Sequence, residues 1–280
     1  MIDVALIGFG EAAQAFVLGA GWGRSARAFD IKTDDVGQAS AKYADYARTR
    51  VAGCENLAAA LSGTAAILSL VTADQALIVA QNAARYFSPG ALYFDMNSVA
   101  PQTKRAAAVV IETAGGWYVD VAVMAPVYPA QMAVPLLVSG PHAEAGVAAL
   151  GALGFSNVRA VGDDVGRAST IKMLRSVMYK GVEALTAECL IACEKAGVTD
   201  EVLASFGNDW SEQADYRLDR IMVHGLRRAA EMAESVKTLE NLGVEPLMTR
   251  GTVARQRAIG ELGISSPPNT LNEKLERLKA

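Results

Sequence analysis

The fold is decided by residues 2–13, IDVALIGFGEAA, an apolar run that leads directly into a glycine-containing turn. The apolar run predicts a strand over residues 2–7, and the segment after the turn predicts a helix. The turn has the pattern G-x-G-x-x-A. Gly8 permits a tight bend, Gly10 lets the backbone approach a pyrophosphate, and Ala13 allows the helix to pack closely on the strand. The free N–H groups at the start of such a helix favour a phosphate. The stretch therefore predicts a dinucleotide site, and a ligand-free βα turn is the alternative.

A second strand is predicted over residues 26–31, and Asp30 stands at its end, twenty residues after Gly10. A carboxylate at this place can accept the ribose hydroxyls of NAD and would repel the 2′-phosphate of NADP, so NAD is the favoured cofactor. Lys32 and Thr33 could bind that phosphate, which keeps NADP open. The predicted cofactor-binding residues lie in the turn and after three strands: Gly8, Phe9, Gly10, Glu11, Ala12, Asp30, Ile31, Lys32, Val71, Thr72 and Asn97.

Predicted strands and helices alternate over the first part of the chain. Further strands are predicted at residues 50–51, 65–71, 91–95, 117–123, 135–139 and 158–161, and further helices at 38–46, 74–86 and 101–114. This alternation predicts an open, mostly parallel α/β sheet. Later segments are helical only, at residues 201–206, 209–225, 227–242, 246–261 and 271–278. We therefore predict a dinucleotide-binding Rossmann domain over residues 1–164, then an all-α substrate and dimerisation domain over residues 165–280.

A long central helix is predicted to open the second domain at residues 165–196, VGRASTIKMLRSVMYKGVEALTAECLIACEKA. The stretch contains no proline, and its apolar residues face nearly all round the helix, which predicts a buried element. Lys172 lies near its start, together with Arg175. A lysine on such a helix either extends its amine to solvent or is held in a site for chemistry.

The composition excludes several classes of function. The chain has 280 residues, of which 51% are apolar, and its net charge of −4 argues against nucleic acid or an anionic membrane as the partner. We find no apolar run as long as a membrane span and no basic segment typical of a secretory signal. Three cysteines are too few for a disulfide framework and fit a reducing cytoplasm. With two histidines in the chain, we expect no metal site.

Four stretches resemble the β-hydroxyacid dehydrogenases, a family that includes 3-hydroxyisobutyrate dehydrogenase and 6-phosphogluconate dehydrogenase. The first is the glycine turn. The others are residues 95–101 (DMNSVAP), similar to D-x-S-T-x-x-P, residues 120–126 (DVAVMAP), similar to D-A-P-V-S-G-G, and residues 166–176 (GRASTIKMLRS), similar to G-x-G-x-x-x-K-x-x-N-N. The resemblance covers nearly the whole chain. It implies Lys172 as the catalytic lysine, Asn97 at the nicotinamide, and substrate contacts from Ser98, Ala122, Val123 and Met124.

Two departures from the family pattern concern the group that binds a substrate carboxylate. Residues 124–126, Met-Ala-Pro, replace the family's serine and two glycines, and a proline has no amide to donate. The two asparagines after the lysine become Arg175 and Ser176, which are therefore candidate substrate residues. Arg175, a rigid fork of donors, could bind the carboxylate instead. Alternatively, the substrate is less acidic or carries an apolar group that packs on Met124 and Tyr128.

A later segment, residues 224–228 (HGLRR), lies near the place of the family's K-D-L, whose lysine touches substrate. Arg228 is therefore a further candidate substrate residue, and a solvated helix face is the alternative interpretation. His224 is more simply explained as a packing residue than as a ligand-facing one.

The resemblance implies hydride transfer between a nicotinamide and the alcohol or carbonyl of a small β-hydroxy acid or related hydroxy compound, with Lys172 as general acid/base. Decarboxylation after oxidation, imine reduction and a non-catalytic regulatory role are alternatives. Known imine reductases usually lack the lysine, so Lys172 favours an alcohol or carbonyl. Members of the family pack the long helix against a second subunit, which implies a homodimer that acts on a small molecule.

Overall fold

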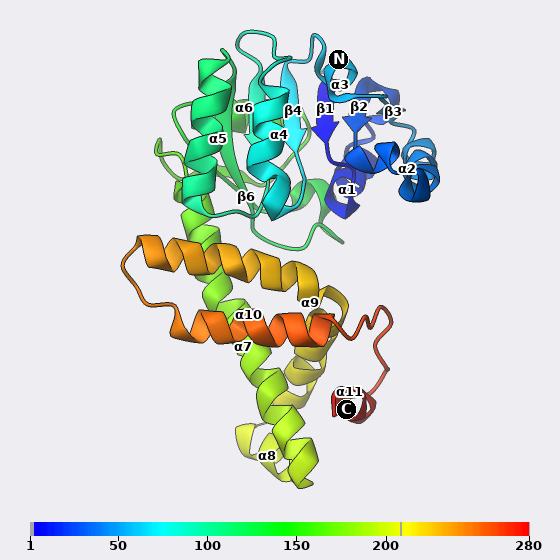
Figure 1. Cartoon of the computed structure of the whole chain (residues 1–280), viewed down its shortest axis with the longest axis vertical. Coiled ribbons are helices and arrows are strands. Elements are labelled where there is room, and N and C mark those ends of the chain that lie inside the picture. Colours follow the sequence, from blue (N-terminus) through cyan, green and yellow to red (C-terminus); the bar gives the residue numbers. More distant parts are fainter. Residues whose placement is uncertain (1–2, 208, 280) are drawn as a thin grey trace. The chain divides into compact units, whose positions relative to one another are not determined.

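The chain divides into two compact units, Met1–Lys172 and Met173–Ala280. Figure 1 shows the computed structural model, which describes residues 3–207 and 209–279. The first unit is an α/β Rossmann domain and the second is all-helical, which confirms the fold class expected from the sequence. The division falls inside the long helix α7 (Arg167–Ala196), whereas the predicted boundary, after residue 164, lies just before that helix.

An eight-stranded sheet forms the centre of the first unit, in the order β3-β2-β1-β4-β5-β6-β7-β8. Its strands pair in parallel except for β6 and β7, which are antiparallel. The chain changes its direction of progress across the sheet between β1 and β4, and ligands bind outside the carboxyl ends of the strands at such a point. The strands are β1 (Val4–Ile7), β2 (Ala26–Phe29), β3 (Ala52–Gly53), β4 (Ala66–Ser69), β5 (Leu92–Asp95), β6 (Trp117–Val123), β7 (Leu136–Ser139) and β8 (Val158–Ala160).

Helices cover both faces of this sheet, so its strands are apolar on both sides. In β1, Val4 and Leu6 join one core cluster and Ala5 and Ile7 join the other, as the two-residue period of a strand requires. The first cluster includes residues of α1 (Glu11–Ala20), α2 (Val36–Thr49) and α6 (Ala143–Ala152), and the second includes residues of α3 (Leu57–Leu61), α4 (Ala76–Ala83) and α5 (Pro101–Thr113).

Two helices of the first unit, α3 and α6, were not predicted from the sequence. In α3, the Asn56 side chain accepts from the Ala59 N–H at 2.9 Å and caps a helix that is only five residues long. Glycines weaken the helical pattern of α6, yet Gly146 has a packing role there. A Cβ on this residue would lie 2.9 Å from Val119 Cγ1 of the sheet. Close packing on the sheet thus overrides the low helix propensity of glycine.

The second unit consists of most of α7 together with α8 (Thr199–Phe206), α9 (Trp210–Asn241), α10 (Leu247–Gly260) and α11 (Leu271–Leu278). Its core contains buried residues of α7, α8, α9, α10 and α11, including Leu190, Leu203, Leu218, Ile259 and Leu275. The final helix begins at a capping box, in which Thr270 and Glu273 each accept from the other's backbone N–H. None of the helices in the described ranges combines the length and the hydrophobicity needed to span a bilayer.

The predicted break between two helices near Gly225 is wrong, because α9 runs without interruption through this residue. Gly225 instead allows α9 to approach α10. A Cβ on Gly225 would lie 2.5 Å from the carbonyl oxygen of Gln256 and 2.6 Å from the Cα of Gly260. The glycine signals a close helix crossing, which the sequence pattern alone cannot distinguish from a helix end.

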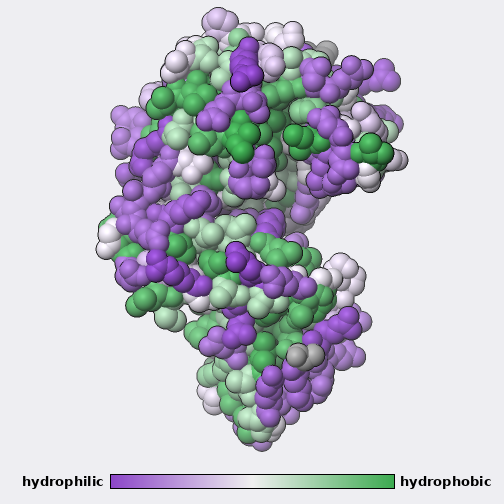
Figure 2. Space-filling view, viewed as in Figure 1, coloured by the Kyte–Doolittle hydropathy of each residue, from purple (hydrophilic) through white to green (hydrophobic). Residues whose placement is uncertain are grey.

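The prediction that α7 is buried on every side is also wrong for the single chain. Met173 and Leu190 are buried, whereas Leu174, Met178 and Leu185 are exposed. Figure 2 shows hydrophobic residues among the hydrophilic ones on the visible surface of both units. The helix therefore buries one stripe of its apolar residues within the chain and leaves others uncovered.

Candidate active site

The turn after β1 is held in a conformation that only glycine adopts easily. Gly8 has φ +83°, and a Cβ on it would lie 2.5 Å from the carbonyl oxygen of Leu70. The Gly8 N–H donates to the Phe29 carbonyl at 2.9 Å and so continues the ladder between β1 and β2. The tight bend inferred for Gly8 from the sequence is thus a close approach of the turn to the end of β4.

Gly10 is the N-cap residue of α1, and its surroundings fit a pyrophosphate. Its φ of −84° and ψ of −162° suit any residue, and no side chain caps the helix. A Cβ on Gly10 would meet no protein atom within 4 Å. Neither the backbone conformation nor the protein's packing requires a glycine here. The missing side chain leaves open space at a helix N-terminus, where an anion is stabilised.

Asp30 follows β2 and ties the turn to the second strand. Its carboxylate accepts from the Phe9 N–H at 2.7 Å and from the Lys32 N–H at 3.0 Å. The Phe9 carbonyl, on the opposite side of Phe9, accepts from the Lys42 amine at 2.7 Å. Asp30 is only 9% exposed, whereas Ile31 is 70% exposed. Each carboxylate oxygen accepts one of these bonds and has a second lone pair that a ribose hydroxyl can use.

Asn97 connects the ends of β4 and β5. Its side-chain oxygen accepts from the Val71 N–H at 2.7 Å, and its side-chain nitrogen donates to Ser69 Oγ at 3.0 Å and to Asp95 Oδ1 at 2.8 Å. The family resemblance implies that this side chain lies at the nicotinamide. These contacts give it a structural task, which is to position Val71 and the exposed Thr72 beside the end of β5.

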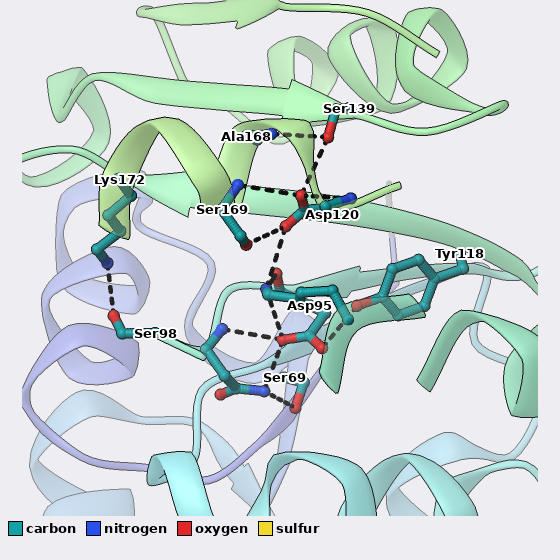
Figure 3. A network of polar contacts seen from close by, with 12 residues as sticks. Ser69, Asp95, Ser98, Tyr118, Asp120, Ser139, Ala168, Ser169 and Lys172 are labelled. Carbon is teal, nitrogen blue, oxygen red and sulfur yellow. Dashed lines mark hydrogen bonds and ion pairs between the residues drawn. The ribbon is translucent and has the colours of Figure 1, made fainter. Parts of the chain in front are cut away.

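Ser98 and Lys172, which the sequence motifs mark as a substrate residue and a catalytic residue, are in contact. The Lys172 amine, at the start of α7, donates to Ser98 Oγ at 2.5 Å. Figure 3 shows this pair at one side of the polar network that joins β5, β6 and α7. Both side chains are half-buried, so the pair is within reach of a small ligand.

Asp120 of β6 holds the beginning of α7. Its carboxylate accepts from the Gly166 N–H at 3.1 Å, from the Ser169 N–H at 3.2 Å and from the Ser169 hydroxyl at 2.7 Å. Ser139 Oγ donates to it at 3.0 Å and accepts from the Ala168 N–H at the same distance. A carboxylate is favoured at a helix N-terminus, where the N–H groups lack partners within the helix.

Lys104, a residue that the sequence analysis missed, connects Asp120 to Asp95. All three side chains are fully buried. The Lys104 amine lies 2.9 Å from Asp95 Oδ1 and 3.3 Å from Asp120 Oδ1. A signal was present, because Lys104 lies between Pro101 and Ile111 at the spacing of the apolar stripe of α5, where a lysine must find buried partners.

Tyr118 completes the network by donating its hydroxyl to Asp95 Oδ2 at 2.8 Å. Burial, together with the Asp95 and Asp120 carboxylates, raises the pKa of the Tyr118 phenol well above its ordinary value. The phenol therefore keeps its proton and remains a hydrogen-bond donor to Asp95 over the physiological pH range.

The substrate segment predicted after β6 is partly buried. Ala122 packs with Leu137 and Ala168 in a small apolar cluster, and its side chain is enclosed. Met124 packs against the same cluster, and its N–H donates to the Pro135 carbonyl at 2.9 Å. Val123 and Met124 are half-buried, so these two side chains keep the surface that a ligand could contact.

The predicted substrate residues in the helical unit differ in their surroundings. The Arg175 guanidinium stacks on the Tyr179 ring at 4.2 Å and is exposed, whereas Ser176 is buried. Arg228 is 7% exposed and forms a bidentate pair with Glu183, in which Nε lies 3.0 Å from Oε2. The solvated helix face considered for Arg228 is therefore wrong. Its donors stabilise the packing of α9 on α7 within the helical unit.

The described ranges contain no group of three or more His, Cys, Asp and Glu residues placed to hold a metal ion.

Comparisons with known proteins relate both units to dehydrogenases. Residues 194–259 match the model of a domain of unknown function, DUF1932. A conserved hypothetical protein from Sinorhizobium meliloti 1021 is 37% identical, with a TM-score of 0.74 over 100% of this chain and 97% of that chain. The conserved protein MTH1747, of unknown function and structurally similar to 3-hydroxyacid dehydrogenases, is 29% identical, with a TM-score of 0.67 over 94% of this chain and 98% of that chain.

The 3-hydroxyisobutyrate dehydrogenase of Mycobacterium tuberculosis, solved with L-serine, has the same fold. It is 15% identical, with a TM-score of 0.73 over the full length of both chains. These similarities confirm the resemblance found in the sequence motifs. The chain belongs, with the Sinorhizobium meliloti protein, to a family that has the fold of the β-hydroxyacid dehydrogenases.

Proposed function

We propose that the protein is an NAD(P)-dependent oxidoreductase that transfers a hydride between the nicotinamide and a carbinol or carbonyl carbon of a small hydroxy compound, with Lys172 as general acid/base. The observation that carries the proposal is the 2.5 Å hydrogen bond from the Lys172 amine to Ser98 Oγ. It joins two residues from separate motifs, 74 positions apart, and leaves both half-buried.

The dinucleotide site is assigned to the turn after β1 and the ends of the neighbouring strands. The open space at Gly10 and the uncapped start of α1 suit the pyrophosphate, and Asp30 suits the ribose hydroxyls. The exposed Lys32 keeps NADP open beside the preferred NAD. When bound, the nicotinamide supplies the acceptor or donor of the hydride.

The protein's own residues handle the proton. In the oxidation direction, a neutral Lys172 amine accepts the proton of the substrate hydroxyl while the carbinol carbon loses its hydride, which leaves a carbonyl. In reduction, the ammonium group returns the proton to the oxygen. Ser98, hydrogen-bonded to Lys172, orients the amine and holds the same oxygen. Proton transfer by such a group contributes about 10²–10⁴-fold to the rate.

Substrate selection is assigned to Met124 and Arg175. Arg175 follows Lys172 by three residues in α7, and such spacing places two side chains on one face of a helix. Its exposed guanidinium provides a carboxylate partner where the family pattern has asparagine. A small hydroxy acid is therefore the preferred substrate class, and Met124 favours one with an apolar substituent.

A second candidate is the reduction of imines. The imine reductase of Streptomyces aurantiacus (19% identical, TM-score 0.55) and the reductive aminase of Aspergillus terreus solved with NADPH (16% identical, TM-score 0.58) share the fold. Lys172 favours alcohol chemistry over this candidate, because an alcohol needs a group that takes its proton.

The protein is further proposed to act as a homodimer in the cytoplasm. Exposed apolar residues on α7 and α9, such as Met178, Leu185 and Leu226, provide surface for a second copy. Cys54, Cys189 and Cys193 are free thiols, as in a reducing compartment. Sedimentation as a monomer at micromolar concentration would contradict the dimer.

The test of the proposed function is a screen of NAD and NADP against hydroxy acids, alkyl and aryl diols, their carbonyl counterparts and cyclic imines, followed at 340 nm. The proposal expects turnover of at least one hydroxy acid, and a labelled product identifies any decarboxylation. Turnover of imines alone would assign the second candidate. Dinucleotide binding without any turnover would favour a regulatory protein.

A further inference from the structure

Lys104 is a fully buried lysine for which the proposed reaction has no direct use. Its side chain has no exposed surface, so the amine cannot exchange a proton with a substrate. The amine nevertheless donates to the Asp95 carbonyl at 2.5 Å and to Asp95 Oδ1 at 2.9 Å, and it forms an ion pair with Asp120 Oδ1 at 3.3 Å. A buried charge is costly unless it is fully paired, so this arrangement calls for a reason.

The first carboxylate, Asp95, organises the loop that presents Ser98. Besides Lys104, its Oδ1 accepts from the Asn97 N–H at 3.0 Å and from the Asn97 side chain at 2.8 Å. The loop after β5 is therefore folded around this carboxylate. Ser98 is the next residue, and its position depends on how Asp95 is held.

The second carboxylate, Asp120, organises the helix that presents Lys172. It accepts from both backbone and hydroxyl of Ser169, one turn before Lys172, and from the Gly166 N–H. Gly166 has φ +95°, and a Cβ on it would lie 2.9 Å from Pro101 Cβ at the start of α5. The first turn of α7 is thus packed against the helix that carries Lys104.

The charges of Asp95 and Asp120 explain why a lysine, Lys104, connects these two residues. Two carboxylates face one ammonium group, and the surplus negative charge lies at the N-terminus of α7, where the helix dipole offsets it. The hydroxyls of Tyr118 and Ser169 each donate to one of the carboxylates. An uncharged side chain at position 104 would leave two buried carboxylates in mutual repulsion and would separate the loop from the helix.

We propose that Lys104 is a positioning residue, which joins Asp95 to Asp120 and thereby sets the distance between Ser98 and Lys172. Figure 3 shows the two halves of this arrangement, with Asp95 below Asp120 and the Ser98–Lys172 pair beside them. The inference rests on the proposed function for its catalytic consequence, but the geometry of the pair can be measured without turnover.

The test compares Lys104→Met with Lys274→Met in the intact protein. Lys274 is a matched control, because it is also buried, at 2% exposure, and pairs with Asp215 at 2.6 Å and Asp219 at 2.8 Å in the helical unit. Each variant is labelled with trinitrobenzenesulfonate at several pH values. The modification of Lys172 is then quantified by peptide mass spectrometry, together with NAD affinity and, for any substrate found, kcat and KM.

Lys104→Met is expected to label faster at Lys172 with a changed pH profile, and to lose about 10- to 100-fold in kcat, the range for a small misplacement of reacting groups. NAD affinity should stay at the wild-type value. Lys274→Met should lower the melting temperature without changing Lys172 labelling or kcat. Wild-type labelling and kcat in a folded Lys104→Met variant would overturn the proposal.

Asp120→Asn is the second variant, and it tests the positioning role of Lys104 if Lys104→Met does not fold. The amide oxygen of the asparagine can take the place of Oδ2 and still accept from the Gly166 and Ser169 N–H groups, while its amide nitrogen takes the place of Oδ1, which faces Lys104 and the Ser169 hydroxyl. This change removes the ion pair with Lys104, and Lys104 keeps its bonds to Asp95. It is expected to change Lys172 labelling in the same direction as Lys104→Met, and an unchanged profile would refute the inference. If labelling responds while even the wild type turns over no substrate, the positioning role holds and the proposed function fails.

Discussion

The substitution Gly10→Ala separates the requirements of the fold from those of the ligand. An added methyl group would meet no protein atom within 4 Å, and φ −84° with ψ −162° is open to alanine. Alanine is a poorer N-cap than glycine by several tenths of a kcal/mol, whereas the loss of glycine from the unfolded chain returns about 0.4–1 kcal/mol. We therefore expect the free energy of unfolding to change by less than about 1 kcal/mol.

The dinucleotide affinity of the same variant is expected to fall. If the pyrophosphate lies against the start of α1, the methyl group occupies part of its space. An extra methyl group in a filled contact costs about 1–3 kcal/mol, which corresponds to about 5- to 150-fold in the dissociation constant. This loss should appear with NAD and with NADP alike, because both cofactors carry the same pyrophosphate.

Isothermal titration with NAD and NADP and urea unfolding of the ligand-free protein together provide the assay. Gly8→Ala is the contrasting variant, because its methyl group would lie 2.5 Å from the Leu70 carbonyl oxygen at φ +83°, so it should lose both stability and affinity. If Gly10→Ala is folded and binds NAD as tightly as the wild type, the site assigned to the pyrophosphate is wrong.

Three further predictions concern stability and cofactor choice. Gly225→Ala should destabilise the helical unit by about 1–3 kcal/mol, because its methyl group would overlap the Gln256 carbonyl, whereas Gly251→Ala meets no atom within 4 Å and should be neutral or stabilising in urea unfolding. Asp30→Ala should lower the affinity for NAD more than that for NADP in a titration, and an equal loss for both would contradict its contact with the ribose hydroxyls. Burial lowers the pKa of Lys180 below its ordinary value of 10.5. The unfolded chain therefore binds the Lys180 proton more tightly than the folded protein does, and the unfolding free energy should rise with pH in the window below 10.5. Lys180→Met should lack this contribution to the rise. If the unfolding free energies of the variant and the wild type depend on pH in the same way, the assignment of the rise to Lys180 is refuted.

The sequence was sufficient for the architecture because the sheet is buried on both faces. Its strands are therefore continuous apolar runs, and two predicted elements, residues 117–123 and 271–278, have the observed bounds. Two of the failures concern glycine. Gly225 looks like a helix end but serves a helix crossing, and the glycines of α6 conceal a helix that the sheet stabilises. Tertiary packing decides both cases, and local helix propensity carries no information about that packing.

The candidate site was predictable only where a motif marks it. Ser98 and Lys172 were expected from their motifs, and the structure brings them into contact. Lys104 lies outside any motif, and its importance comes from Asp95 and Asp120, which adjacent parallel strands bring together. The solvated helix face considered for Arg228 was wrong because this residue is buried against Glu183, which lies 45 positions away in the chain. Long-range pairing of charges is the information that a single sequence lacks.

Lys172 is proposed to move the proton in a dinucleotide-dependent reaction, and the turnover number of Lys172→Ala, measured together with its NAD affinity, tests this role most directly. We expect kcat to fall by about 10²–10⁴-fold while NAD is still bound at the wild-type affinity, because the amine touches Ser98 and lies outside the glycine turn. A Lys172→Ala protein that keeps nearly full turnover would show that Lys172 does not move the proton.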